Sequence, residues 1–367
     1  MEREGLFESV PNFSEGRRND VIAAIAGATA AHVLDVDADP DHHRVVISLA
    51  AERARLVDGL LAAVGAAVER IDVRAHSGVH PRVGAADVVP IVPLGGSTLP
   101  GAREVAQEVG ERIWSELRVP VYWYGEHRSL ADIRAGRATP DLGGPEHHPT
   151  AGAVSVGARL ALVAFNVVLP GMSMVEAGAL ARSLRESRAG MRGVQALAFE
   201  LPGGRVQLSM NLFRVDETPP AAVVAELLRR GIAVGDQQLV GLCPAIAAGR
   251  VGGGRLLEGR LAAAAARAAA VRCRDRAGDE EALALAQRLE REASALAALG
   301  VEQIELLVGA ERASALTRVL RAAQVLDGEL EAMLEAAVLG LQAAIRPETA
   351  AVYSTRMAAL YRKQNGV

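Results

Sequence analysis

The sequence predicts an α+β protein with two sheets, each with helices on one face, followed by an all-α C-terminal region. Up to Leu242, short apolar runs alternate with amphipathic segments of helical length, twice in the approximate order β-α-β-β-α-β. Nine of the eleven aromatic residues lie between Phe7 and Phe213, and none lies between Arg214 and Val352. The order of elements is that of two ferredoxin-like (split βαβ) subdomains, and the aromatic-poor stretch marks a different region.

The first half contains strand patterns rich in apolar residues and helix patterns of 3.6-residue period. The expected elements are a strand at Leu6–Val10, a helix at Arg17–Ala28, a strand pair at Val33–Asp37 and Arg44–Ala50, a helix at Leu56–Val68, a strand at Val88–Leu94, a helix at Ala102–Leu117 and a strand at Pro120–Tyr124.

The second half repeats this pattern after a link rich in Gly, Pro and His at Gly143–Gly152. Its expected elements are a strand at Leu160–Leu169, a helix at Met174–Arg188, strands at Val194–Leu201 and Val206–Leu212 joined by a Pro-Gly-Gly turn, a helix at Ala221–Gly231 and a strand near Leu239. From about Gly254 the pattern is helical. The expected domains are therefore 1–142, 143–248 and 249–367.

Composition excludes several classes of function. The net charge of −4 and the pI near 6.1 give no general electrostatic reason to bind nucleic acid or an anionic membrane. The two cysteines, Cys243 and Cys273, form no Cys-x-x-Cys pair, which argues against a disulfide scaffold. The longest apolar run, Val154–Leu169, carries Arg159 and is too short to span a bilayer. With no signal-peptide pattern at the N-terminus, we expect a soluble cytoplasmic protein.

Lysine is almost absent, because Lys363 is the only one. No Schiff-base lysine and no P-loop lysine are therefore plausible. The sequence also lacks a GxGxxG fingerprint after a strand, a GxSxG elbow and an HExxH motif, so hydride transfer and serine hydrolase chemistry lose support.

Three segments contain residues suited to catalysis or binding. In the segment from Arg74 to Leu94, His76 and His80 are separated by Gly78, and Pro81 follows His80, so we expect an irregular loop before a buried strand. Imidazole transfers protons in both directions near neutral pH, which makes these histidines candidate bases. A histidine that only caps loop carbonyls is the alternative.

The second segment places Asp35 and Asp37 on one side of a strand, where a carboxylate could orient a histidine. The alternative is a solvated acidic turn. Asp37, His42, His43 and His80 could also be interpreted as metal ligands, but no tight ligand spacing supports this, and no metal is predicted.

The remaining candidates lie at strand ends and in the Gly-rich link. Asn12 follows the first strand, a usual ligand position, although a plain turn and helix cap explains the same residues. After the link, Arg159 lies within an expected apolar strand and needs an anionic partner, either a buried carboxylate or a substrate. The same run ends at Ala164-Phe165-Asn166.

In this order the motifs resemble the glutamate formimidoyltransferase (formiminotransferase) family, over about residues 5–245. The matching segments are VPNFSEG (10–16), LDVDA (34–38), H-x-G-x-HPR-x-GA-x-DV-x-P (76–90), HPTAGA-x-x-x-GAR-x-x-x-x-AFN (148–166), GVQALAFEL (193–201) and QLVGL (238–242).

The resemblance implies transfer of a formimino group from N-formimino-L-glutamate to N5 of the co-substrate tetrahydrofolate, by a homodimer or larger homo-oligomer. It implies that His80 is the catalytic base and that Asp37 supports it. Asn12, Arg82, Arg159 and Asn166 are the expected folate- or substrate-binding residues, with the arginines placed by their chemistry and position.

Two regions depart from the family pattern. The link between Gly125 and Gly144 is shorter than in many members. In fused members a loop introduces a cyclodeaminase, and in the tail of this sequence only Val251–Gly254 shows a weak similarity to that loop. We interpret the tail as a helical packing or oligomerisation domain, or as a degenerate cyclodeaminase-like region without assigned activity. A non-catalytic folate-binding protein, or a transferase for another formyl or formimino donor, remains an alternative.

Overall fold

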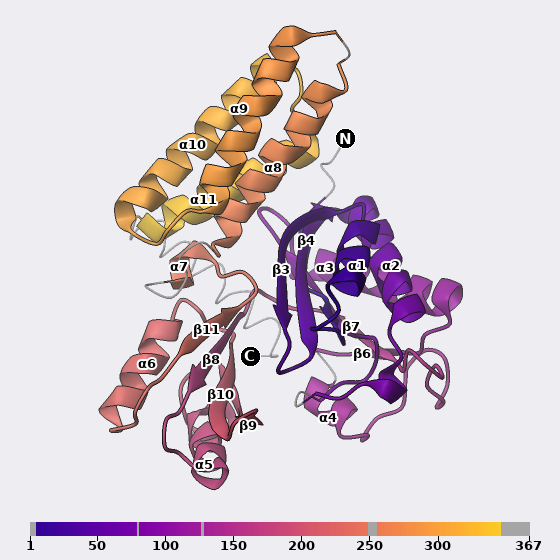
Figure 1. Ribbon diagram of the computed structural model, residues 1–367, viewed down its shortest axis with the longest axis vertical. Coiled ribbons are helices and arrows are strands. Elements are labelled where there is room, and N and C mark those ends of the chain that lie inside the picture. The colour runs from indigo at the N-terminus through magenta and orange to yellow at the C-terminus, as the bar shows by residue number, and fades with distance from the viewer. Residues whose placement is uncertain (1–4, 79–80, 126–127, 249–254, 277, 346–367) are drawn as a thin grey trace. The chain divides into compact units, whose positions relative to one another are not determined.

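The computed structural model describes residues 5–78, 81–125, 128–248, 255–276 and 278–345. They form a mixed α/β protein with two sheets and a C-terminal helical region, which confirms the predicted class at that level (Figure 1). The chain divides into two compact units, at Leu160 and Ala161. His80, the predicted base, lies outside the described residues.

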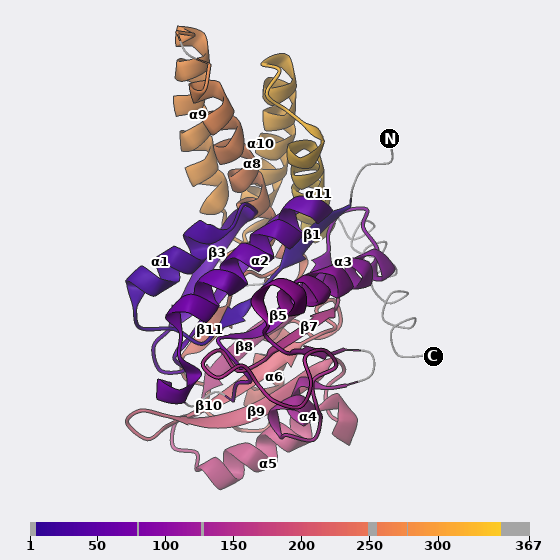
Figure 2. The ribbon, with the colours of Figure 1, turned by 90° about the vertical axis from the view of Figure 1, so that its right-hand side faces the viewer.

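The first unit contains a seven-stranded sheet. Its strands are β1 (Leu6–Ser9), β2 (Asn12–Phe13), β3 (His32–Asp39), β4 (Arg44–Glu52), β5 (Ala86–Pro93), β6 (Val121–Trp123) and β7 (Val154–Ala158). β3 pairs with β4 at one edge of the sheet. Both β1 and β2 lie between β4 and β5. β7 runs parallel to its neighbours β5 and β6. Figure 2 shows the helices α1 (Asn19–Ala28), α2 (Arg53–Arg70) and α3 (Leu99–Arg112) side by side across this sheet.

Successive side chains of each strand point to opposite faces of this sheet, so one face forms the apolar core and the other does not. Ile47 and Leu49 of β4, with Val89 and Ile91 of β5, are at most 1% exposed and belong to the cluster formed with the helices. Local signals agree with this packing. α3 begins after Thr98, whose side chain accepts the N–H of Gly101, and a proline lies in its first turn.

Shorter elements connect these strands and helices. They are η1 (Val73–Ala75), the π-helical turn η2 (Ile113–Leu117) that continues α3, and α4 (Leu130–Arg134). The predicted helix Ala102–Leu117 therefore ends in a wider turn, and α4 was not predicted.

The second unit contains a four-stranded antiparallel sheet in the order β11-β8-β10-β9. Its strands are β8 (Val163–Val168), β9 (Val194–Leu201), β10 (Arg205–Leu212) and β11 (Gln237–Val240), and its connecting helices are α5 (Met174–Leu184), η3 (Glu186–Arg188) and α6 (Pro220–Arg229). The expected hairpin turn joins β9 to β10, with Gly203 and Gly204 at positive φ.

The C-terminal region is helical, as predicted. After α7 (Ala245–Ala248) come α8 (Leu257–Arg274), α9 (Glu280–Ala297), α10 (Gln303–Ala322) and α11 (Gly328–Ile345). α8 packs against α9 and α11, and α10 packs against α11 (Figure 1). Buried alanines along α8 allow this close packing.

The strand expected at Leu160–Leu169 is present as β8, whereas β7, which precedes it in the same apolar run, was not predicted. β7 ends at Ala158 in the first sheet, and β8 begins at Val163 in the second. Arg159 therefore lies just after a strand, not inside one. The apolar run contains no Gly, Pro or Asn between Ala158 and Val163 to indicate the break.

Candidate functional site

The face of the first sheet opposite its buried core carries two of the predicted residues. Asp37 of β3 pairs with Val46 of β4, Val46 pairs with Asn12 of β2, and Asn12 pairs with Val88 of β5. Residues paired in this way lie in one row on the same face. We call this surface, with Glu8, Asn12, Asp37 and Arg44, the polar face of the first sheet.

Charged side chains gather at the end of this face. Arg44 pairs in register with Asp39, and burial lowers the pKa of Arg44, whereas the negative charges of Asp87, Asp39 and Asp37 raise it. Asp87 is 3% exposed, forms an ion pair with Arg134 and accepts the N–H of Val83 at 2.6 Å. The carboxylates and arginines thus compensate one another, as buried charges require.

A small hollow opens among these groups. It has room for about one water molecule, and it is lined by Ser14, His42, His43, Arg44, Arg82 and Asp87. Burial lowers the pKa of Arg82, and the charge of Asp87 opposes this shift. Arg82 also donates from Nη2 to the carbonyl oxygen of Gly78 at 3.1 Å. The structure therefore places Arg82 beside the turn between β3 and β4.

Backbone contacts hold three of the sequence motifs together. Ser14 donates from its N–H to the Ala85 oxygen at 2.8 Å and from Oγ to the Gly84 oxygen at 2.7 Å. Ala85 donates to the Ala151 oxygen at 2.8 Å, and a Cβ on Gly84 would lie 2.1 Å from the oxygen of Ala153. Only glycine allows this approach.

Two carboxylates stabilise the turns that border the hollow. Glu15 accepts the N–H groups of Arg17 at 2.9 Å and of Arg18 at 3.0 Å, so it caps the approach to α1. These bonds and the Arg18 guanidinium outweigh burial and lower the pKa of Glu15 to about 2. Asp39 binds His42 through Oδ2 and Nδ1 at 2.8 Å, and its pKa is likewise lowered to about 2 despite burial.

Arg159 lies at a different place on the polar face. Its N–H donates to the Ile91 oxygen at 3.0 Å, on the edge of β5. Its charge lowers the pKa of Glu8, but burial is the larger effect and raises that pKa to about 7. The buried Glu8 carboxyl is thus close enough to Arg159 to feel its charge, a proximity that the sequence did not identify. The sequence signal was a glutamate among apolar residues in LFES.

Asn166 lies in the second unit. It is 3% exposed, and its Nδ2 donates to Oε1 of Gln238 at 3.2 Å. Ser209 pairs with Asn166 in register, and Gln207 follows on the same face of β10. We call this surface the amide face of the second sheet. Within the described residues, the buried Oε1 of Gln207 has no hydrogen-bond partner.

Histidines of the Gly-rich link have structural contacts. His147 Nε2 lies 2.8 Å from the hydroxyl of Tyr122, and His148 Nδ1 accepts the N–H of Ala151 at 3.0 Å. Arg44, Asp87 and Arg134 were missed by the sequence interpretation, although Asp87 belongs to the quoted GA-x-DV motif.

Among the described residues, no group of three or more His, Cys, Asp or Glu side chains could hold a metal ion. None of the described helices is both long and apolar enough to cross a membrane.

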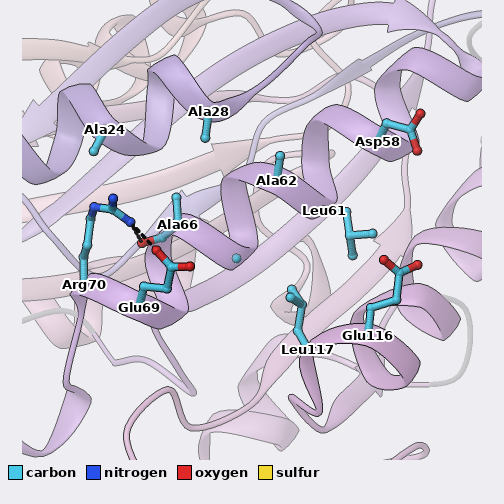
Figure 3. A pocket seen from close by; sticks show the side chains of 11 residues that line it. Ala24, Ala28, Asp58, Leu61, Ala62, Ala66, Glu69, Arg70, Glu116 and Leu117 are labelled. Atoms are coloured by element: carbon cyan, nitrogen blue, oxygen red, sulfur yellow. Dashed lines mark hydrogen bonds and ion pairs between the residues drawn. The ribbon is translucent and has the colours of Figure 1, made fainter.

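Another groove lies apart from the polar face. It is open to solvent and bordered by α1, α2 and η2, and its lining combines small residues such as Ala24, Ala28 and Ala62 with charged ones (Figure 3). Arg70 and Glu69 pair with each other at its rim. None of the predicted site residues lines it, so we assign the candidate site to the polar face.

Comparison with known proteins identifies the family. Residues 6–159 match the N-terminal subdomain of the formiminotransferase domain. A glutamate formimidoyltransferase of Thermoplasma acidophilum is 37% identical over 268 residues, covering 65% of this chain and 88% of that protein. The glutamate formimidoyltransferase of Streptococcus pyogenes is 34% identical, with 65% and 89% covered.

The chain belongs to the formiminotransferase family. A formimidoyltransferase-cyclodeaminase of Sus scrofa is also 37% identical over 272 residues, which cover 65% of this chain but 50% of that longer protein. The helical region of this formiminotransferase, from α8 to α11, is consistent with the cyclodeaminase part of such relatives.

Proposed function

We propose that this formiminotransferase moves a formimino group from N-formimino-L-glutamate to N5 of tetrahydrofolate and releases glutamate, with His80 as the general base. The names of its relatives support the reaction. One structural observation carries the choice of site: Asn12, Asp37 and Arg82, from three separate motifs, lie on or beside the polar face of the first sheet.

In this proposal His80 removes the proton of N5 as N5 attacks the formimino carbon. A bond forms between N5 and that carbon, the bond from the carbon to the glutamate nitrogen breaks, and the leaving amine takes up a proton. Asp37 stabilises the protonated histidine, and its charge also acts on the nearby Arg44.

Substrate binding is assigned to groups outside the proton transfer. Arg82 and Arg159 bind substrate carboxylates, for which a guanidinium fork is well suited. Asn12 and Asn166 supply neutral donors and acceptors for folate or substrate. Burial of Arg82 beside Asp87 supports a role in which an incoming carboxylate adds to its partners.

The finer architecture is also proposed. The strand orders of the two sheets support two ferredoxin-like subdomains. The second sheet has the order β11-β8-β10-β9. The first sheet has the corresponding order β5, then β1 together with β2, then β4, then β3. We retain the domains 1–142, 143–248 and 249–367, a cytoplasmic homodimer or larger homo-oligomer, and no nucleic-acid or membrane partner. The helical region is assigned packing or oligomerisation, or a degenerate cyclodeaminase-like origin, without activity.

The test is steady-state turnover of the purified chain. We expect N-formimino-L-glutamate to be consumed, and glutamate released, only when tetrahydrofolate is present. Folate binding without turnover would instead support a non-catalytic or regulatory protein. Faster turnover of N-formyl-L-glutamate than of the formimino donor would support a transferase for another donor.

A further inference from the structure

His43 has an unusual backbone in the turn between β3 and β4. Its φ is 50°, in the left-handed region that residues other than glycine, asparagine and aspartate rarely adopt. A residue held in this conformation must be fixed by its surroundings. The contacts of its side chain show what fixes it.

Both ring nitrogens of His43 face oxygen atoms. Nδ1 lies 2.8 Å from the carbonyl oxygen of Ser77, and Nε2 lies 3.1 Å from Oε1 of Glu15. A carbonyl and an ionised carboxylate only accept hydrogen bonds, and Glu15 is 1% exposed. Each contact is therefore a hydrogen bond when the ring nitrogen concerned carries a proton, so acceptors flank the ring on both sides.

The segment from His76 to Gly78 packs against this ring and its backbone. The rings of His76 and His43 stack with centroids 4.0 Å apart, and His76 Nε2 donates to the carbonyl oxygen of His43 at 2.9 Å. A Cβ on Gly78 would lie 2.7 Å from the oxygen of His42, so only glycine fits against the turn. On the other side, Arg82 donates to Gly78.

We propose that His43, held by Glu15, is a positioning residue that anchors the segment His76–Gly78, which precedes the proposed base His80 in the sequence by two residues. The inference rests on the proposed function of His80, but the anchoring can be tested separately. The decisive contact is the hydrogen bond from Nδ1 of His43 to the oxygen of Ser77.

Two matched substitutions separate the ring contacts. In His43→Asn the amide nitrogen takes the place of Nδ1 and retains the bond to Ser77, and asparagine tolerates the left-handed backbone. In His43→Gln the amide nitrogen takes the place of Nε2 and retains the bond to Glu15 only. Both variants lose the aromatic stack and each retains one of the two contacts, so their difference reports whether the Ser77 contact matters more than the Glu15 contact.

Two readouts are measured on the full chain at matched folded fractions. We expect kcat for formimino transfer to fall at least tenfold further in His43→Gln than in His43→Asn, with KM values for both substrates within about threefold of wild type. Hydrogen–deuterium exchange of the peptide spanning residues 75–83 should be faster in the glutamine variant. Equal kcat values and equal exchange in the two variants would overturn the proposal.

A failure of the proposed function would give a different result in these measurements. If the wild-type chain does not transfer a formimino group, the catalytic assignment fails, while the exchange comparison still supports or overturns the anchoring. If His43→Gln does not fold, His76→Phe replaces it, because this change keeps the stacked ring and removes the bond to the His43 oxygen. Exchange and kcat equal to wild type in that variant would also overturn the anchoring.

Discussion

The two sheets differ in the chemistry of the faces that lie opposite their apolar cores. The polar face of the first sheet carries ionisable groups, with Glu8, Asp37 and Arg44 as its main members. The amide face of the second sheet carries neutral groups, with Asn166 hydrogen-bonded to Gln238. Neutral amides can bind a substrate but transfer no proton, so the comparison assigns the acid–base step to the first sheet.

The largest expected effect is the loss of the predicted base. His80→Ala should lower kcat by roughly 10²–10⁴-fold, the range for removal of a general base, in assays of formimino transfer. His32→Gln is the matched control, because His32 is a buried histidine at the start of β3 whose Nε2 contacts Arg55. Similar activity in the two variants would remove His80 from the mechanism.

The buried charges of the polar face should be costly to leave without partners. Asp87→Ala removes the ion-pair partner of Arg134 and a negative charge near Arg44, and should lower the free energy of unfolding by about 3–5 kcal/mol. Asn166→Ala, in the amide face, should lower it by only about 1 kcal/mol. Urea denaturation measures both, and equal losses would contradict the distinction between the faces.

Glu8 should make the stability of the first sheet depend on pH. Burial raises its folded-state pKa from 4.5 to about 7, so the proton it retains stabilises the fold fully below pH 4.5, and this contribution is lost as the pH rises through 7. At pH 8, Glu8→Gln should therefore unfold with a free energy roughly 3 kcal/mol above wild type.

At pH 4 the difference between Glu8→Gln and wild type should nearly disappear. Chemical denaturation at the two pH values measures it. A glutamine variant that is less stable than wild type at pH 8 would show that the ionised carboxylate is well solvated or tightly paired in the folded protein.

The smallest effect is expected in the amide face. Gln207 is buried, and its Oε1 lacks a partner among the residues that the structure describes. Gln207→Met keeps the approximate size and removes the unsatisfied oxygen, so the midpoint of thermal unfolding should stay the same or rise slightly. A loss of stability above about 2 kcal/mol would indicate that this amide has a structural partner.

The sequence was informative wherever a residue pattern has a local cause. Alternation in Val206–Leu212 and the Pro-Gly-Gly turn predicted β10 and its hairpin, and the helical period predicted α2. β7 was missed because it shares one apolar run with β8, and no turn residue marks the break after Arg159. The ionic contacts of Asp87 with Arg134, and of His43 with Glu15, join residues distant in the chain, and only the fold brings them together.

The most direct test of the assignment compares one residue from each face in the same assay. We predict that Asp37→Asn lowers kcat for formimino transfer at least tenfold with little change in KM, because the carboxylate stabilises a charge that develops during the reaction. Asn166→Ala should instead raise KM and retain most of kcat. A fall in kcat for Asn166→Ala, with normal kcat for Asp37→Asn, would contradict the account, because it would remove Asp37 from the chemical step.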